Sequence, residues 1–365
     1  MQHPSLRLGL FPALSGLVGL VGLVGLAAIL LGCGGESTTS GTTSGTPDAG
    51  PTFHYAHDDT LRLNQLQVKG THNSYHIAQP AAIKPLAYTH APLDVQFREQ
   101  GVRQIELDTH YNYVKEVYEV YHLGTFDEGT TCRLFTDCLK VIKGWSDANP
   151  AHVPIFIQIE PKDSPTKDEA EDLFGRLEGD VLAVFPRERV ITPDSVRGSA
   201  KSVREGLAAN GWPTLGQVRG KILFFVDNSA GFREYYTHEN QDLDGRLMFI
   251  DGDLDSPWSG VILANTPDTD AAKIAAALKA NLIVRTRADG DNVEPFAGDT
   301  THRDEAIKSG AQLISTDYPA VVKGVPAMGT PYVVEIPGGT PARCNPVTAP
   351  KECSSKDIED PQFIH

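Results

Sequence analysis

The chain of 365 residues is long enough for one large domain or two ordinary ones, and its composition, 40% hydrophobic and 22% charged, is typical of a globular protein. Its formal net charge of −15 at pH 7 opposes general binding to nucleic acid and to anionic lipid. We therefore expect no nucleic acid partner, and no sequence feature implies a protein partner.

The first segment has the layout of an export signal. Residues 8–31 form an uncharged run dominated by Leu, Val, Gly and Ala after Arg7. The run ends in Gly32-Cys33 and resembles the bacterial lipoprotein cleavage site, in which a small residue precedes the Cys that receives lipid. A transmembrane helix is the alternative, because the run could cross the ~30 Å hydrocarbon layer. Its glycines and Cys33 favour processing: we expect residues 1–32 to be a lipoprotein signal peptide and Cys33 to be lipidated, in an exported protein anchored to the cell envelope.

Residues 33–55 follow as a predicted flexible tether, since residues 34–50 are rich in Gly, Ser and Thr and contain no large apolar residue that could be buried. Four cysteines remain after Cys33. An even number in an exported chain favours two disulfides between sequence neighbours, and the spacing lacks the Cys-x-x-Cys pattern that zinc binding would favour. The expected pairs are Cys132–Cys138 and Cys344–Cys353.

Past Asp58, eight candidate strands alternate with segments that have helical periodicity, such as residues 167–185 and 270–280. This pattern predicts an α/β protein with a (β/α)8 TIM-type barrel over residues 56–325, a span close to the ~250 residues usual for that fold. Residues 326–365 are expected to be a short extension held by its disulfide. The candidate strands are residues 66–68, 102–107, 117–121, 153–159, 221–226, 246–250, 281–284 and 312–315.

Titratable or amide side chains lie at or just after the ends of four successive candidate strands. His72 and Asn73 follow the first strand, and Glu106 and Asp108, two positions apart, point the same way at the end of the second. A lone histidine or acid at a strand end is more often a structural residue. Four strand ends with such groups, counting His122 and Glu160, predict a catalytic site at the carboxyl end of the barrel.

The order His72-Asn73, Glu106-x-Asp108, His122 and Glu160, together with residues 309–319, resembles the calcium-dependent phosphoinositide-specific phospholipases C, which are PLC-like phosphodiesterases. The resemblance extends over residues 61–358. It implies an enzyme that cleaves the phosphodiester of phosphatidylinositol and releases diacylglycerol and an inositol phosphate, with a phospholipid or phosphodiester substrate at a membrane surface.

The resemblance also implies the roles of the site residues. Ca²⁺ takes six to eight oxygen ligands, so one amide and three carboxylates leave room for substrate oxygens. His72 and His122 are the expected catalytic residues on either side of the phosphodiester, and we assign protonation of the leaving group to His122. His76 and His110 remain further candidates. The implied calcium ligands are Asn73, Glu106, Asp108 and Glu160.

Weaker signals predict substrate contacts near the strand ends, where a cation could bind phosphate and an aromatic face could cover a sugar ring. The residues are Lys162, Arg285, Arg287 and Tyr318.

Two other functions remain open. A glycerophosphodiester phosphodiesterase shares the barrel, the acids and the histidines, but that family usually has His-Arg-Gly where this chain has His72-Asn73-Ser74. A catalytically inactive surface lipoprotein that binds a sugar or phosphate would have no need of the complete set of acids and histidines.

Overall fold

The computed structural model describes residues 53–80, 82–228, 230–321, 332–360 and 362. The predicted signal peptide, Cys33, residues 33–52 of the tether and residues 326–331 of the extension lie outside the described residues. None of the helices within the described ranges combines the length and the apolar character needed to cross a membrane.

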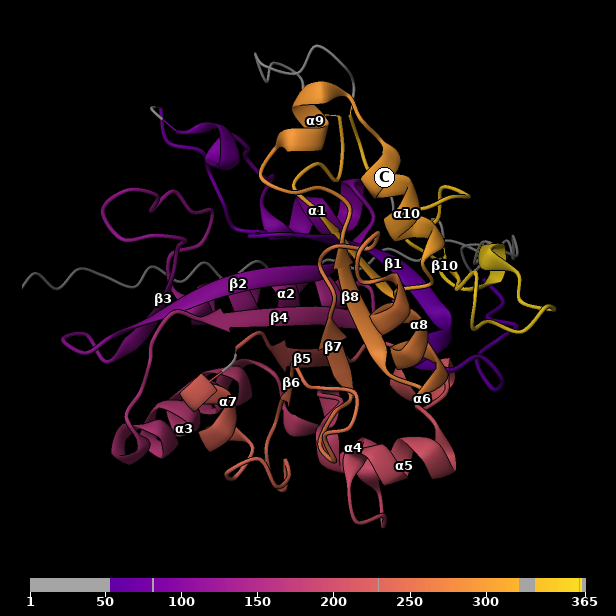
Figure 1. Cartoon of the computed structure of the whole chain (residues 1–365), viewed down its shortest axis with the longest axis horizontal. Coiled ribbons are helices and arrows are strands. Elements are labelled where there is room, and N and C mark those ends of the chain that lie inside the picture. Colours follow the sequence, from indigo (N-terminus) through magenta and orange to yellow (C-terminus); the bar gives the residue numbers. More distant parts are fainter. Residues whose placement is uncertain (1–52, 81, 229, 322–331, 361, 363–365) are drawn as a thin grey trace, which may run out of the picture. The chain divides into compact units, whose positions relative to one another are not determined.

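Eight parallel strands form the wall of a barrel in the order β6-β5-β4-β2-β1-β9-β8-β7 (Figure 1). A parallel bridge between Asp251 and Val261 links the two ends of this order, so the barrel is nearly closed. The predicted (β/α)8 TIM-type barrel is confirmed. The strands are β1 (Leu66–Thr71), β2 (Val102–Asn112), β4 (Ile155–Pro161), β5 (Ile222–Val226), β6 (Phe249–Ile250), β7 (Val261–Leu263), β8 (Ile283–Arg287) and β9 (Leu313–Thr316).

The membership of the eight strands differs from the prediction in two places. The candidate strand at residues 117–121 is β3 (Val117–Val120), which pairs antiparallel with β2 as a hairpin and is not part of the barrel wall. Only residues 113–116 separate the two strands, and a parallel crossover needs a dozen residues or more. The strand missing from the prediction is β7, whose three residues are too few to show a period.

Helices connect the strands, and α3 and α8 confirm the two helices predicted from periodicity. In α3, Glu169 accepts a hydrogen bond from the backbone N–H of Thr166 at 3.0 Å and caps the first turn. The helices are α1 (Leu93–Glu99), α2 (Phe135–Ala148), α3 (Lys167–Val184), α4 (Pro193–Arg197), α5 (Val203–Asn210), α6 (Leu215–Val218), α7 (Ala230–Tyr236), α8 (Ala271–Lys279), α9 (Val293–Ala297) and α10 (Thr301–Lys308).

The barrel strands are buried on both faces, as expected for a parallel sheet covered by helices. In β5, all five residues are buried; Leu223 and Phe225 belong to one hydrophobic cluster, whereas Ile222, Phe224 and Val226 belong to another. Alternate side chains of a strand point to opposite faces, so one short apolar run contributes to two cores. This explains why β5 reads as a continuous hydrophobic segment.

The C-terminal extension packs onto the barrel. β10 (Ala342–Cys344) pairs antiparallel with the first half of β1, and both predicted disulfides, Cys132–Cys138 and Cys344–Cys353, are present. Farther on, Glu359 Oε1 lies 2.9 Å from Nε of Arg103 on β2, and both side chains are fully buried. The extension therefore supplies the counter-ion of a charged side chain that is buried in the barrel.

This ion pair predicts a stability effect. Glu359→Ala leaves the Arg103 guanidinium buried without its counter-ion, which should lower the free energy of unfolding by about 3–5 kcal/mol. Urea unfolding followed by circular dichroism measures it, with Glu352→Ala at an exposed position as the control. A loss no larger than that of the control would contradict a structural role for the pair.

Candidate active site

The carboxyl ends of the barrel strands gather most of the predicted site residues at one end of the barrel. β1 leads into His72 and Asn73, and β4 contains Glu160 next to its last residue. β2 continues to Asn112, so Glu106 and Asp108 lie near its middle and not at its end as predicted. Later strands add basic and acidic groups at the same end. These are Arg285 and Arg287 of β8 and Asp317, which directly follows β9.

Three carboxylates form an acidic cluster at this end. Asp108 is the direct partner of Glu160 in the β2–β4 register, and Glu106 lies two residues earlier on the same face of β2. One oxygen of each carboxylate lies within 4.8 Å of the others. Burial and the neighbouring Glu160 raise the pKa of Asp108 well above its usual value. Such a cluster needs a cation to keep all three groups ionised.

Oxygen atoms without hydrogen-bond donors indicate where a cation fits. Within the described residues, Oδ1 of the buried Asn73 has no hydrogen-bond partner, although its Nδ2 donates to the Tyr88 hydroxyl at 3.1 Å. Oδ1 of Asp108 is likewise without a partner. Ser74 links the segment after β1 to β2, because its N–H donates to the carbonyl of Glu106 and its Oγ accepts from the N–H of Glu106. These hard oxygen donors fit Ca²⁺.

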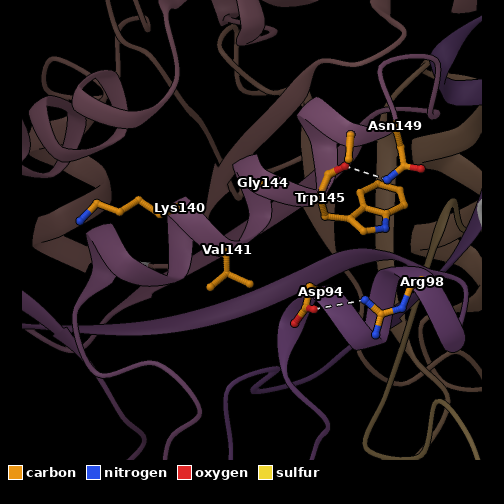
Figure 2. Close-up of a pocket in the computed structure, with 8 residues that line it drawn as sticks. Asp94, Arg98, Lys140, Val141, Gly144, Trp145 and Asn149 are labelled. Atoms are coloured by element: carbon orange, nitrogen blue, oxygen red, sulfur yellow. Dashed lines mark hydrogen bonds and ion pairs between the residues drawn. The ribbon is translucent and has the colours of Figure 1, made fainter. Parts of the chain in front are cut away.

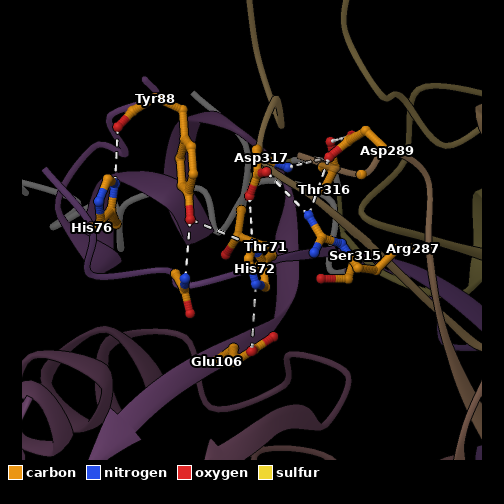
Figure 3. Close-up of polar contacts among 12 residues, drawn as sticks. Thr71, His72, His76, Tyr88, Glu106, Arg287, Asp289, Ser315, Thr316 and Asp317 are labelled. Atoms are coloured by element: carbon orange, nitrogen blue, oxygen red, sulfur yellow. Dashed lines mark hydrogen bonds and ion pairs between the residues drawn. The ribbon is translucent and has the colours of Figure 1, made fainter. Parts of the chain in front are cut away.

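His72 is held from both sides (Figure 3). Its Nδ1 lies 2.8 Å from Asp317 Oδ1, and its Nε2 lies 3.9 Å from Glu106 Oε1. Arg287 Nη2 lies 3.2 Å from the other Asp317 oxygen. Burial, and next the charge of Arg287, lower the pKa of His72 well below 6.5, which favours a neutral imidazole. Because Nδ1–H donates to Asp317, Nε2 is the nitrogen free to accept a proton.

His122 has a carboxylate partner of its own. Its Nδ1 lies 2.9 Å from Oδ2 of the buried Asp127, and its side chain is about one-fifth exposed. Asp127 also accepts from Nε2 of His76 at 2.9 Å, while Nδ1 of His76 bonds the carbonyl of Tyr88 at 2.9 Å. His76 is fully buried and fixes Asp127, so it is not placed to reach a substrate.

The remaining predicted residues differ in their positions. Arg285 is buried, with Nη2 2.5 Å from Glu106 Oε2 and Nη1 2.6 Å from Asn265 Oδ1. The hydroxyl of buried Tyr318 donates to Asn292 at 2.6 Å, so this ring is not exposed at the mouth of the barrel, the end at which the strands have their carboxyl ends. The ammonium of Lys162 contacts Asp108 and Glu160. Nε2 of His110 lies 2.9 Å from the carbonyl oxygen of Tyr121.

Three acids that contact the predicted site residues or neighbour them were not predicted from the sequence. Asp317 and Asp227 directly follow apolar strands, which is the same signal that identified the other residues. Burial, and then the charge of Glu106, raise the pKa of Asp227 to about 7, and Gln158 donates to it at 2.9 Å. Asp127 gave no signal, because it lies in a loop and meets His122 and His76 only through folding.

A separate cavity of about 550 Å³ lies on the helical layer between α1 and α2 (Figure 2). None of the predicted site residues lines it. Its walls are Asp94, Arg98, Lys140, Val141, Gly144, Trp145, Ala148 and Asn149.

Solved structures with a similar fold are known. The fold is similar to a Ca²⁺-dependent phosphatidylinositol-specific phospholipase C from Streptomyces antibioticus, at 18% identity and a TM-score of 0.52, over 71% of this chain and 95% of that one. It is also similar to a calcium-dependent phosphoinositol-specific phospholipase C from a Pseudomonas species, at 19% identity and a TM-score of 0.54, over 79% and 96% of the respective chains.

A comparison with curated protein sequences found no match. The family model described as phosphoinositide phospholipase C, Ca²⁺-dependent, matches residues 61–113 and 110–346, which is well over half of the chain. The chain therefore belongs to the Ca²⁺-dependent phosphoinositide phospholipase C family.

Proposed function

We propose that this enzyme cleaves the phosphodiester of phosphatidylinositol in a calcium-dependent reaction and releases diacylglycerol and an inositol phosphate. The observation that carries this proposal is the pairing of two carboxylate-bound histidines, His72 and His122, with the acidic cluster at the mouth of the barrel. The family match favours this function over glycerophosphodiester cleavage.

The calcium site uses the unsatisfied oxygens of the mouth. Asn73 Oδ1 and the carboxylates of Glu106, Asp108 and Glu160 would hold the ion. When bound, Ca²⁺ supplies charge stabilisation for the phosphoryl oxygens and lowers the pKa of a coordinated hydroxyl. Arg285 keeps Glu106 in place through the 2.5 Å contact.

The two histidines divide the proton transfers. His72 presents Nε2 to the mouth as a neutral acceptor, which suits removal of a proton from an inositol hydroxyl next to the phosphate. Asp317 holds that ring in place and stabilises the imidazolium that forms. His122, whose Nδ1 is bound to Asp127, offers its other nitrogen as the acid that protonates the departing diacylglycerol oxygen.

The calcium site gives a direct binding prediction. Asp108→Asn removes a charged oxygen from the cluster, so its calcium Kd, measured calorimetrically in chelator-treated protein, should rise by about tenfold or more. Asp253→Asn changes an exposed acid outside the cluster and serves as the control. Equal calcium binding by wild type and Asp108→Asn would remove Asp108 from the ligand set.

The histidine roles predict different responses to the leaving group. His72→Ala and His122→Ala should each lower kcat on phosphatidylinositol by roughly 10²-fold or more, a barrier change of about 3 kcal/mol, and should melt near wild type. A nitrophenyl inositol phosphate needs no proton on its leaving group, so it should restore turnover in His122→Ala but not in His72→Ala. Equal defects of His122→Ala on both substrates would overturn its role as the acid.

We also propose that the enzyme acts at a membrane surface through an apolar rim around the mouth. The proposed rim comprises exposed side chains that lie after β1, within and after the β2–β3 hairpin, and after β8. It includes Val114, which is 95% exposed, and Phe126, which is 81% exposed. Large exposed apolar side chains grouped around one opening are typical of lipid-binding surfaces. Because the net charge of the chain is −15, binding to the membrane would depend on insertion of apolar side chains and not on attraction to anionic lipid. The other members are Ile77, Ile83, Tyr113, Leu123 and Val293.

If the rim binds lipid, its loss should weaken binding to vesicles but not the hydrolysis of a soluble substrate. The double variant Val114→Ser and Phe126→Ser should bind phosphatidylinositol vesicles at least about tenfold more weakly, because each large apolar side chain contributes ~1.5–3 kcal/mol when it leaves water. Hydrolysis of a soluble nitrophenyl inositol phosphate should stay at the wild-type rate. Val347→Ser, at an exposed position on the C-terminal extension, is the control in a vesicle sedimentation assay. Unchanged vesicle binding by the double variant would refute the rim.

A further inference from the structure

The acidic cluster already contains an internal cation. Nζ of Lys162 lies 2.9 Å from Asp108 Oδ2 and forms a close ion pair with Glu160 Oε1. The backbone N–H of Lys162 donates to the carbonyl of Thr109 at 2.9 Å, which extends the β2–β4 pairing past the strand end and fixes where the side chain starts. Two of the three carboxylates proposed to bind calcium therefore share one ammonium group.

The third carboxylate is paired differently. Glu106 contacts Arg285, whose guanidinium also donates to Asn265 and Ser315. Arg285 as a whole is 1% exposed. Arg285 is thus held on several sides inside the barrel. The Lys162 side chain is 21% exposed and consists of a flexible stem, so its ammonium can leave the cluster without breaking other described contacts of its head group.

Competition follows from the chemistry of the shared oxygens. A calcium ion needs carboxylate oxygens as direct ligands, and the ammonium is ion-paired with oxygens of the same two groups. Two cations in one buried cluster also repel each other strongly, because the effective dielectric constant there is well below that of water. The carboxylates of the cluster can therefore bind either the Lys162 ammonium or a calcium ion tightly, but not both at once.

We propose that Lys162 is a built-in competitor of calcium: its ammonium holds Asp108 and Glu160 together in the calcium-free enzyme, and calcium binding must displace it. Lys162 therefore sets the calcium affinity of the site. The displaced ammonium is then free to bind the phosphate of the substrate, which is the role predicted for Lys162 from the sequence. This inference rests on the proposed calcium-dependent function.

Calorimetric titration of the chelator-treated full chain with Ca²⁺ alone tests the competition. Lys162→Met, which keeps the length of the side chain without its charge, should bind calcium at least about tenfold more tightly than wild type. Lys162→Arg keeps the positive charge and should stay within a fewfold of wild type. Lys167→Met removes a lysine that is 68% exposed and paired with Glu239 away from the cluster, so its affinity should equal that of wild type.

Thermal unfolding provides a second readout that needs no turnover. In chelator, Lys162→Met should melt below wild type, because Asp108 and Glu160 lose their shared cation, and saturating calcium should raise its Tm by more than it raises that of wild type. If the Met variant does not fold, Lys162→Gln replaces it in both measurements.

The outcomes separate this inference from the proposed function. Calcium binding to wild type with equal or weaker binding to the uncharged Lys162 variants would overturn the competition and leave the calcium site standing. A wild-type protein that binds no calcium would overturn the calcium site and the competition together. Tighter binding by Lys162→Arg as well would assign the effect to the shape of the side chain and also overturn the inference.

Discussion

The register between β2 and β4 is the constraint on which the site depends. It places Asp108 directly beside Glu160, with Glu106 on the same face, and so gathers three carboxylates in a region where Asp108 and Glu106 are buried. Three ionised acids at such a place repel each other unless a cation joins them. Lys162 supplies that charge in the protein alone, and in the proposed reaction a calcium ion would supply more of it. A shift of one residue in this register would turn the acids to the opposite face.

Around this cluster, the barrel supplies two histidines by different routes. His72 follows β1, and its partner Asp317 follows the adjacent strand β9, so the parallel pairing of neighbouring strands brings them together. His122 follows the β2–β3 hairpin, an excursion from the barrel wall, and its partner Asp127 lies in the next loop. Each imidazole therefore has one nitrogen bound to a carboxylate. The scaffold fixes the orientation of both rings before substrate binds, which reduces the cost of reaching the reactive geometry.

The sequence predicted the barrel and most of the residues that gather at one end of it, because the signals were local. Glu106, Asp108 and Glu160 interrupt apolar strands, and that pattern is visible without any knowledge of the tertiary structure. The sequence could not distinguish the hairpin strand β3 from a barrel strand, since both are short apolar runs, and it gave no sign of β7. Asp127 and the ion pair of Arg285 with Glu106 depend on long-range packing. Tyr318 follows a strand as predicted, yet its side chain turns to Asn292 inside the protein.

The proposed reaction is the calcium-dependent cleavage of phosphatidylinositol at the mouth of the barrel. The most direct measurement is phosphorus NMR of phosphatidylinositol vesicles incubated with the full chain, at saturating free Ca²⁺ and in excess chelator. The structure predicts a water-soluble inositol phosphate, with diacylglycerol left in the lipid phase, only when calcium is present. Equal product formation in chelator, or release of free inositol with phosphatidic acid left in the vesicles, would contradict the claim.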